Sequence, residues 1–370
     1  MRIKSVPQSL SFAGSSPTPF VGRYGYPSVQ VGMLATPTPD SAAAQLDDPR
    51  LWSAQNYSIM NIADLRTQLL HSRTLVHVKK TSTILPLMQE VSMASRPVEL
   101  EVSLKKKPVF KLTFDSHHAP TGPLAELEHA RITANSHIPT AVQKVVSDTD
   151  LLAASGCQEL YNHGFDEHAL TKLLSTGSLG TEKRRRLVPT RWAITATDDL
   201  LCQHVLETVK QQPLTDAYRV FVGGYLGNYY VLLFFPHNFQ YELFETYVPT
   251  PAQYSTDYEN FGGRTSYVEQ CAGGYYAPRL AISEYLAKTK RQASVLALRF
   301  ITTEYTMPLG VWVTREATRK ALVNKPLSFS TKELALTFVK NLARTKFGID
   351  IAEQLNKSKL LKQLQQKRLF

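Results

Sequence analysis

Four aspartates stand in two close pairs, Asp148 with Asp150 and Asp198 with Asp199. Paired carboxylates can hold a divalent cation, and magnesium prefers hard oxygen ligands, so these residues could support metal-assisted phosphodiester chemistry. An aspartate that precedes a helix can instead cap it by accepting a backbone N–H. We expect capping by Asp148 or Asp150 and by Asp198. Asp148 and Asp150 are kept as catalytic candidates that would use Mg2+, and the sequence implies no other cofactor.

A second candidate set consists of tyrosines that lie close to glycines and arginines. Glycine permits close backbone approach, tyrosine stacks or hydrogen-bonds, and arginine binds phosphate with a planar fork. One cleft for a nucleotide or a nucleic-acid end could therefore be lined by Arg23, Tyr24, Tyr26, Arg264, Tyr275, Tyr276 and Arg279. The alternative is a set of tight turns with core tyrosines, in which Asp257 and Glu259 pair with the arginines. Glu259 and Arg264 are further catalytic candidates.

Basic residues outnumber acidic ones, 42 against 31, which gives a net charge of +11. This excess favours a polyanionic partner, contacted mainly through phosphates. The positive charge is concentrated at residues 105–107, at residues 183–186 and near the C-terminus. The predicted nucleic-acid contacts are Lys183, Arg184, Arg185, Arg186, Arg191 and Trp192, together with Arg23, Tyr275, Tyr276 and Arg279. Arg191 followed by Trp192 suits single-stranded or distorted DNA. A buried Trp192 beneath an ion-paired Arg191 is the alternative.

Residues 366–370 combine a glutamine, two spacers, and adjacent leucine and phenylalanine. They resemble the short peptides by which bacterial replication and repair proteins dock on the sliding clamp. Leu369 and Phe370 could each contribute about 1.5–3 kcal/mol in an apolar pocket, with the Gln366 amide hydrogen-bonding at its mouth. The alternative is the end of a helix, because Leu360, Leu361 and Leu364 recur at helical spacing.

Composition limits the class of protein. A chain of 370 residues that is 43% hydrophobic can form one large or two ordinary domains. We find no apolar run that could span a bilayer and no signal peptide, so no membrane partner is expected. Cys157, Cys202 and Cys271 lack CxxC spacing, which favours a reducing compartment and excludes a cysteine zinc site. We expect a cytoplasmic, nucleoid-associated protein.

Periodicity predicts a mixture of helices and strands. Helices are expected at 57–72, 84–94, 140–155, 166–175, 198–211, 277–288, 315–323 and 331–346. Asp166 is expected to cap the helix at 166–175, and Ser330 the helix at 331–346. Strands are expected as a pair within 97–114, and at 218–222, 229–235, 240–246, 293–303 and 309–314. A loop rich in proline and glycine marks an internal boundary near residue 260.

Several ordered segments lie spread over nearly the whole chain: FVGRYGYP at 20–27 with VG at 31–32, SDTD at 147–150, LG at 179–180, RLVPTRW at 186–192 with ITA at 194–196, DYE at 257–259, GR at 263–264, GGYYA at 273–277 with RLA at 279–281, KRQA at 290–293 and PLGVW at 308–312. Together they resemble the Nre proteins, a family described in archaea as DNA-repair factors. The resemblance implies a DNA-damage-response protein that works with other repair proteins through a clamp-docking peptide.

The chain departs from that family pattern in two places. In archaeal members the peptide resembles a longer clamp motif, in which a glutamine and two spacers are followed by an aliphatic residue at the fourth position. Counting from Gln363 as the first position places Gln366, not an aliphatic residue, at the fourth. The shorter form that starts at Gln366 favours a clamp of bacterial or phage type. Family members also often carry a cysteine-rich, zinc-finger-like segment, but here no cysteine precedes Cys157. We therefore expect no zinc finger.

The sequence thus predicts a mixed α/β (α+β) protein of two closely packed parts, with a central mixed sheet and a flexible C-terminal tail. The expected divisions are an extended start at 1–15, an Nre N-terminal domain at 16–260, an Nre C-terminal domain at 261–350 and a tail at 351–370. The predicted function is a repair factor that binds the sliding clamp and DNA. The alternative is an enzyme acting on a nucleotide or nucleic acid, either a metal-dependent nuclease or a nucleotidyl- or ADP-ribosyl-type transferase.

Overall fold

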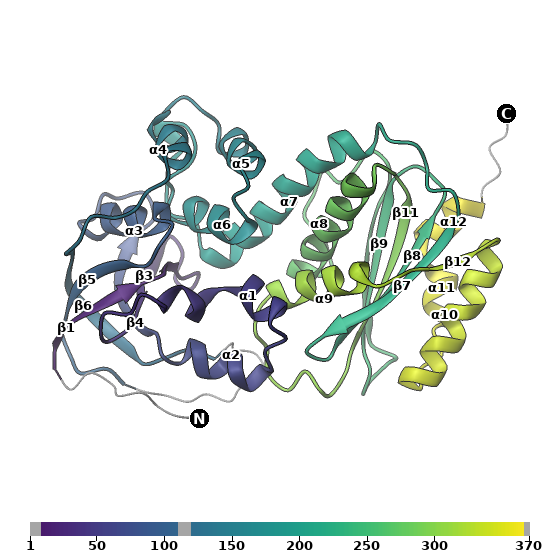
Figure 1. Ribbon diagram of the computed structural model, residues 1–370, viewed down its shortest axis with the longest axis horizontal. Helices are drawn as coiled ribbons and strands as arrows, with labels where there is room; N and C mark the ends of the chain where they lie inside the picture. Colours follow the sequence, from purple (N-terminus) through teal and green to yellow (C-terminus); the bar gives the residue numbers. More distant parts are fainter. Residues whose placement is uncertain (1–8, 110–119, 366–370) are drawn as a thin grey trace. The chain divides into compact units, whose positions relative to one another are not determined.

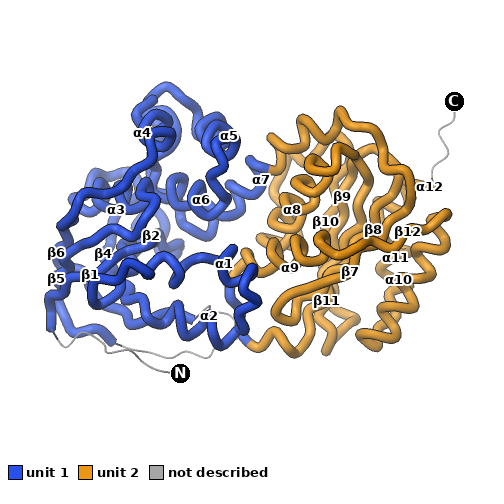
Figure 2. The backbone as a smooth tube through the Cα atoms, viewed as in Figure 1, with its two compact units in different colours: residues 1–201, 307–309 blue, residues 202–306, 310–370 orange. Residues whose placement is uncertain are grey.

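The computed structural model describes residues 9–109 and 120–365, and in it helices alternate with the strands of two six-stranded sheets (Figure 1). Figure 2 shows two compact units: unit 1 comprises residues 1–201 and 307–309, and unit 2 comprises residues 202–306 and 310–370. Each unit has its own sheet, and both sheets contain parallel and antiparallel pairs. The predicted mixed class is confirmed, with two mixed sheets in place of one central sheet. The compact units divide at 201/202, whereas the boundary near residue 260 was predicted from sequence.

Unit 1 is built on a strongly curved sheet with the strand order β1-β5-β6-β4-β3-β2. Its strands are β1 (Ser11–Ser16), β2 (Thr18–Val21), β3 (Ser28–Ala35), β4 (Leu70–His77), β5 (Val98–Leu104) and β6 (Leu124–Ile132). Only Pro17 separates β1 from β2, although these are the two edge strands. Thr36, just after β3, donates its backbone N–H to the carbonyl of Ser15 at 3.0 Å, so the bend at Pro17 brings the two edges together.

Helices and short turns of unit 1 surround this sheet. They are η1 (Ala43–Asp47), α1 (Pro49–Ala54), α2 (Ile59–Arg66), α3 (Ile84–Met93), α4 (Thr140–Ser147), α5 (Ala153–Asn162), α6 (Glu167–Ser175), η2 (Glu182–Arg184) and the first part of α7 (Thr190–Val209). The core joins alternate residues of β5, such as Leu100 and Val102, to Met88 of α3. These side chains are 0–1% exposed, so the period-two pattern of β5 is satisfied by burial on one face.

Unit 2 has a sheet with the order β10-β9-β11-β8-β7-β12. Its strands are β7 (Tyr218–Tyr225), β8 (Asn228–Phe235), β9 (Gln240–Tyr247), β10 (Tyr254–Glu259), β11 (Ser294–Ile301) and β12 (Leu327–Phe329). Its helices, after the end of α7, are α8 (Ala272–Thr289), α9 (Trp312–Val323), α10 (Lys332–Phe347), α11 (Ala352–Lys357) and α12 (Lys359–Gln365). Helices α8 and α9 cover one face of the sheet and α10–α12 cover the other (Figure 1).

The continuous apolar run predicted at 229–235 forms β8, an interior strand with neighbours on both sides. Its alternate side chains face opposite helical layers: Phe235 packs in the core beside α10–α12, while Phe234 lies 5.8 Å, ring to ring, from Tyr285 of α8. Both phenylalanines are 1% exposed. Burial on two faces explains why this strand reads as an unbroken hydrophobic segment.

Several predicted elements are confirmed and several are wrong. The helix predicted at 84–94 is α3, and Asp166 caps α6 by accepting the N–H of Ala169 at 2.8 Å. Strand β5 pairs with β6. In the second strand predicted within 97–114, Val109 makes only an isolated bridge to Leu124, and residues 110–114 lie outside the described part. The strand predicted at 309–314 is wrong, since α9 begins at Trp312.

Three helix ends also differ from the prediction. Helix α2 ends at Arg66, before β4 takes up the remaining apolar residues. The cap of α10 is Thr331 rather than Ser330, since the Thr331 hydroxyl accepts the N–H of Leu334 at 3.2 Å. Helix α7 begins at Thr190, so Asp198 is in its interior and does not cap it. None of the helices in the described ranges is both long and apolar enough to cross a membrane.

The segment predicted as a flexible tail is folded as far as residue 365. Leu360 and Leu361 of α12 are 0% and 5% exposed and join the core beneath β9. Their helical spacing thus reports a packed amphipathic helix rather than a free end. Gln366, Leu369 and Phe370, the predicted clamp-binding residues, lie outside the described residues.

Candidate nucleic-acid interface

The first turn of α7 is fixed against two other elements of unit 1. The Thr190 hydroxyl accepts the backbone N–H of Val21 at 3.1 Å, and it lies 3.1 Å from the hydroxyl of Ser175 at the end of α6. The next two residues, Arg191 and Trp192, are exposed, with 46% of Trp192 accessible. The buried alternative for Trp192 is therefore wrong, and a held helix start presents the indole to solvent.

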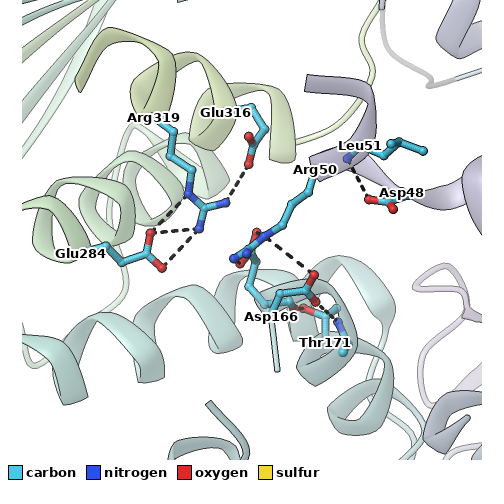
Figure 3. Close-up of polar contacts among 10 residues, drawn as sticks. Asp48, Arg50, Leu51, Asp166, Thr171, Glu284, Glu316 and Arg319 are labelled. Carbon is cyan, nitrogen blue, oxygen red and sulfur yellow. Dashed lines mark hydrogen bonds and ion pairs between the residues drawn. The ribbon is translucent and has the colours of Figure 1, made fainter. Parts of the chain in front are cut away.

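Helix α6 is itself anchored by ionic contacts at its N-terminus (Figure 3). Arg50 of α1 donates to the Glu167 carboxylate and lies 3.7 Å from that of Asp166. Asp48 caps α1 in the same way that Asp166 caps α6, by accepting the N–H of Leu51 at 3.0 Å. Because Glu167 is only 3% exposed and its partner is half exposed, this pair fixes α6 more firmly than a surface pair would.

A tight connection between β2 and β3 presents the first two tyrosines. Gly22 donates its N–H to Gln30 at 2.7 Å, and Ser28 donates to the carbonyl of Gly25 at 3.0 Å. Gly25 has φ +80°, a left-handed conformation that favours glycine. The turn leaves Tyr24 71% exposed and Tyr26 45% exposed.

The structure brings Tyr26 and Trp192 together, although they are far apart in the sequence. Their ring centroids are 5.1 Å apart with an interplanar angle of 49°. Beside them the Arg23 guanidinium lies 4.8 Å from the ring centroid of Tyr24, and its Nη2 donates to the Tyr24 hydroxyl at 2.9 Å. Two exposed rings in contact, with a third ring and a cation nearby, form a surface on which bases can stack. We call Tyr24, Tyr26 and Trp192 the aromatic platform.

The basic segment at 183–186 is linked through Val78 to the turn that carries Tyr24 and Tyr26. Leu187, the next residue, donates its N–H to Val78 at 3.3 Å, and Val78 donates to the carbonyl of Pro27 at 2.9 Å. Those two bonds connect the basic segment to the residue that follows Tyr26. Lys183, Arg184 and Arg186 are exposed.

Two further cations were missed at the sequence level. Lys79 and Lys80 are exposed and directly follow Val78, between the platform turn and the basic segment. Their signal in the sequence was a lysine pair after an apolar strand, which by itself is typical of any solvated loop. Only the pairing of Val78 with Pro27 and Leu187 gives the lysine pair its place.

Arg185 differs from its neighbours because it supports the backbone. Its Nε donates to Gly180 at 2.7 Å, and its Nη2 donates to the carbonyls of Val146 and Asp148 at 2.7 and 3.1 Å. The residue is half-buried and ties the basic segment to the end of α4. The predicted phosphate contact of Arg185 is therefore replaced by a structural one.

The aspartate candidates are not brought together. The Asp148 carboxylate accepts the N–H groups of Asp150 and Leu151, both at 3.0 Å, in the turn that follows α4. It stabilises a turn rather than the N-terminus of α5, whose cap is Leu152. Asp198 is 0% exposed within α7. Over the described ranges, no group of three or more His, Cys, Asp or Glu side chains could hold a metal ion.

The remaining tyrosines and arginines belong to unit 2 and are largely internal. Tyr275 and Tyr276 are 0% and 5% exposed, and Arg279 is 3% exposed with its Nε 2.7 Å from the Glu259 carboxylate. Arg264 donates to three backbone carbonyls, of Tyr258, Ser266 and Tyr267. The predicted cleft is thus corrected: the unit 2 members are core and loop supports, as in the alternative of tight turns and internal pairs.

Burial changes the ionisation of this interior. Loss of hydration raises the pKa of Tyr275 well above its ordinary value, and the nearby Glu259 carboxylate acts in the same direction.

On the neighbouring helices, Arg319 of α9 pairs with Glu284 of α8 at 3.0 Å and with Glu316 at 2.7 Å (Figure 3). The pair with Glu284 holds α8 and α9 against each other, and the pair with Glu316 lies within α9.

Comparison with known proteins places this molecule in a class of DNA-repair proteins. The chain belongs to the Nre family: residues 1–252 match the family model described as "Archaeal Nre, N-terminal" and residues 259–370 match "Archaeal Nre, C-terminal". The resemblance stated from the sequence segments is confirmed.

Named relatives give the family assignment its detail. The chain is 35% identical to DNA repair protein NreB of Archaeoglobus fulgidus over 364 residues, covering 96% of this chain and 90% of the relative. It is 35% identical to DNA repair protein NreA of Haloferax volcanii over 84% of this chain and 77% of the relative. It is 37% identical to NreA of A. fulgidus over 87% and 83%. No solved structure matches the chain.

Proposed function

We propose that this Nre-family protein binds single-stranded or distorted DNA through the aromatic platform and the basic residues beside it. The observation that carries the proposal is the contact between Tyr26 and Trp192, two half-exposed rings flanked by cations. Base stacking on an aromatic side chain contributes about 1–3 kcal/mol per base and tolerates any sequence. Lesions and repair intermediates expose unstacked bases, so such a platform suits a repair factor.

Phosphates would be held by the partly exposed Arg23 and by the exposed cations Lys79, Lys80, Lys183, Arg184, Arg186 and Arg191. Arginine adds a fork geometry that matches phosphate oxygens. These contacts carry little sequence information, so binding should be strong for unpaired DNA of any composition and should weaken with salt.

The test is fluorescence anisotropy with an unpaired oligonucleotide and a duplex of equal length. Trp192→Ala should weaken binding to the unpaired strand by about 5- to 100-fold, because one stacking partner is lost. Leu152→Ala is a matched control, since Leu152 is 53% exposed and its backbone contacts are unchanged by the substitution. Equal affinities of the wild-type protein and Trp192→Ala for the unpaired strand would refute the platform.

Docking on a sliding clamp is the second part of the proposal. It is supported by the residue pattern at 366–370 and by family membership. Helix α12 ends at Gln365, immediately before that pattern, and is packed in the core of unit 2. The peptide would therefore bind the clamp close to the body of unit 2, with DNA and other repair proteins as neighbours.

Calorimetry with purified clamps tests this part. The wild-type chain should bind with a Kd of about 1 μM, and Leu369→Ala with Phe370→Ala should abolish the signal, because both apolar anchors are removed. Lys362→Ala, an exposed residue of α12, is the control. Absence of binding by the wild-type chain to bacterial, phage and archaeal clamps would reject the docking peptide.

A further inference from the structure

The ends of α7 and α8 meet in unit 2 through the side chain of Gln292. Its Nε2 donates to the backbone carbonyls of Lys210 and Gln212 at 3.2 and 2.6 Å, and its Oε1 accepts the N–H of Phe239 at 3.3 Å. Gln292 is 8% exposed, so these bonds are shielded from water. The segment 290–293, singled out in the sequence, is therefore fixed next to the end of α7.

Four basic side chains gather at this point. Lys210 follows α7, while Lys288, Lys290 and Arg291 surround the end of α8, and the last three are exposed. Lys290 ends the helix in the left-handed conformation with φ +52°. None of the four forms an ion pair with any residue of the described ranges.

Favourable interaction with the helix dipole explains Lys288 in the last turn of α8. Lys210, Lys290 and Arg291 lie beyond the last turns of α7 and α8. A concentration of cations without carboxylate partners is the electrostatic pattern of a phosphate-binding surface.

An exposed phenylalanine borders the same cations. The Lys210 ammonium lies 5.0 Å from the ring centroid of Phe261, and Phe261 is 43% exposed. One face of the ring is thus occupied by a cation while the residue remains accessible to solvent. Cation and aromatic ring together recur at sites that bind single-stranded nucleic acid.

The loop that carries Phe261 is held in place by the side chains of Asp257 and Arg264. Asp257 accepts the backbone N–H groups of Glu269, Gln270 and Cys271 at 3.0, 2.9 and 2.7 Å. Arg264 fixes the same loop through the three carbonyls described above. A loop anchored by two largely buried charges presents its aromatic side chain with little loss of conformational entropy on binding.

We propose that Lys210, Phe261, Lys288, Lys290 and Arg291 form a second contact for single-stranded nucleic acid, on unit 2 and separate from the aromatic platform. This inference rests on the proposed DNA binding. One base stacks on Phe261, and the flanking phosphates bind the lysines and Arg291. Each unit then has its own contact for an unpaired strand.

The test uses the full-length chain and a 30-nucleotide oligo-dT, with anisotropy measured across a salt series. Lys290→Ala with Arg291→Ala should lower the slope of log K against log salt by about 1.4, because each phosphate contact with a single strand contributes about 0.7. Phe261→Ala and the milder Phe261→Leu should both weaken binding, by about 5- to 100-fold for alanine. The control is Lys325→Ala with Lys359→Ala, two exposed lysines of unit 2.

A combination with Trp192→Ala separates this inference from the proposed function. If both are right, Trp192→Ala retains residual salt-dependent binding that Phe261→Ala then weakens further. If Trp192→Ala weakens binding but the Phe261 and Lys290/Arg291 variants match their control, the second contact is refuted and an acidic protein becomes the partner of this surface. If the wild-type chain shows no salt-dependent binding, both proposals fail.

Discussion

The carboxylate of Glu242 accepts the backbone N–H of Leu360 at 3.0 Å, which attaches the last described helix to the sheet of unit 2. The same carboxylate accepts the N–H of Lys359 at 2.9 Å and the hydroxyl of Ser358. Glu242 is 1% exposed. A strand residue thus satisfies the free N–H groups at the start of α12, which a side chain within the helix would ordinarily do.

Glu242→Gln should destabilise unit 2 by about 1–3 kcal/mol, because an amide has one acceptor oxygen and its NH2 group faces buried donors. The measurement is the urea midpoint at pH 7, with Glu353→Gln, at an exposed position of α11, as the control. An unchanged midpoint would show that α12 is held by its leucines alone.

The pH dependence of the same residue has a definite sign. Burial raises the pKa of Glu242 above its ordinary 4.5, although bonds from Ser358 and the backbone act to lower it. Between pH 4.5 and the raised pKa the folded state binds more protons than the unfolded state, so stability falls as pH rises through this window. This decline should be absent in Glu242→Gln. Unfolding free energies at several pH values check it.

His71 of β4 has the opposite sign. Burial, assisted by the charges of Arg66 and Arg73, lowers its pKa from 6.5 to about 3. The folded state then binds fewer protons than the unfolded state, so the contribution of neutral His71 is present above pH 6.5 and is lost as pH falls toward 3. The loss should approach roughly 1.4 kcal/mol per pH unit. Thermal unfolding followed by fluorescence should show a flatter acid limb for His71→Asn.

Arg185 and Arg184 should separate the structural from the binding role of the basic segment. Arg185→Ala removes three hydrogen bonds to backbone carbonyls and should cost about 1.5–3 kcal/mol of stability. Arg184→Ala, at an exposed position, should leave stability within about 0.5 kcal/mol and reduce only DNA affinity. Chemical denaturation together with anisotropy distinguishes them. The reverse pattern would show that the carbonyl contacts of Arg185 contribute little.

Gly32 in β3 should not tolerate a side chain. A Cβ at this position would lie 1.8 Å from the carbonyl oxygen of Ser72 on β4, and backbone cannot move aside cheaply. Gly32→Ala should destabilise unit 1 at the upper end of the roughly 1–3 kcal/mol range for overpacking. Gly164→Ala offers a contrast: no atom lies within 4 Å of its Cβ, although its φ of +89° adds backbone strain. The thermal midpoint of Gly32→Ala should therefore be lower than that of Gly164→Ala.

Much of the fold of unit 2 could be predicted from sequence because its strands carry strong local signals. The run at 229–235 can satisfy its apolar side chains only inside a sheet, and β8 lies there. By contrast, Trp312 and Val313 read as strand residues but begin a helix, because packing of α9 on β7 overrides β propensity. Pattern alone could not show that Leu360 packs under β9, since that depends on Glu242 more than a hundred residues earlier.

The candidate site was predictable residue by residue but not as an arrangement. Arg191 and Trp192 were singled out by type, and Tyr24 and Tyr26 by their glycines. Their assembly depends on the bond from the Val21 N–H to the Thr190 hydroxyl, which has no signature in any one segment. The same types of residue around Tyr275 fold inward, because α8 packs that tyrosine against Tyr241 with ring centroids 4.9 Å apart.

The pairing of β1 with β5 has a consequence while the chain is being synthesised. Strand β1 emerges from the ribosome early, but its partner β5 follows much later, as the 92-residue separation of Ser11 and Ser103 shows. Until β5 is synthesised, β1 presents unpaired N–H and C=O groups that could pair with another nascent chain. Once β5 has paired with β1, those N–H and C=O groups are hydrogen-bonded within the molecule. Unit 1 should therefore be most prone to aggregate during translation, and much less so after its synthesis is complete.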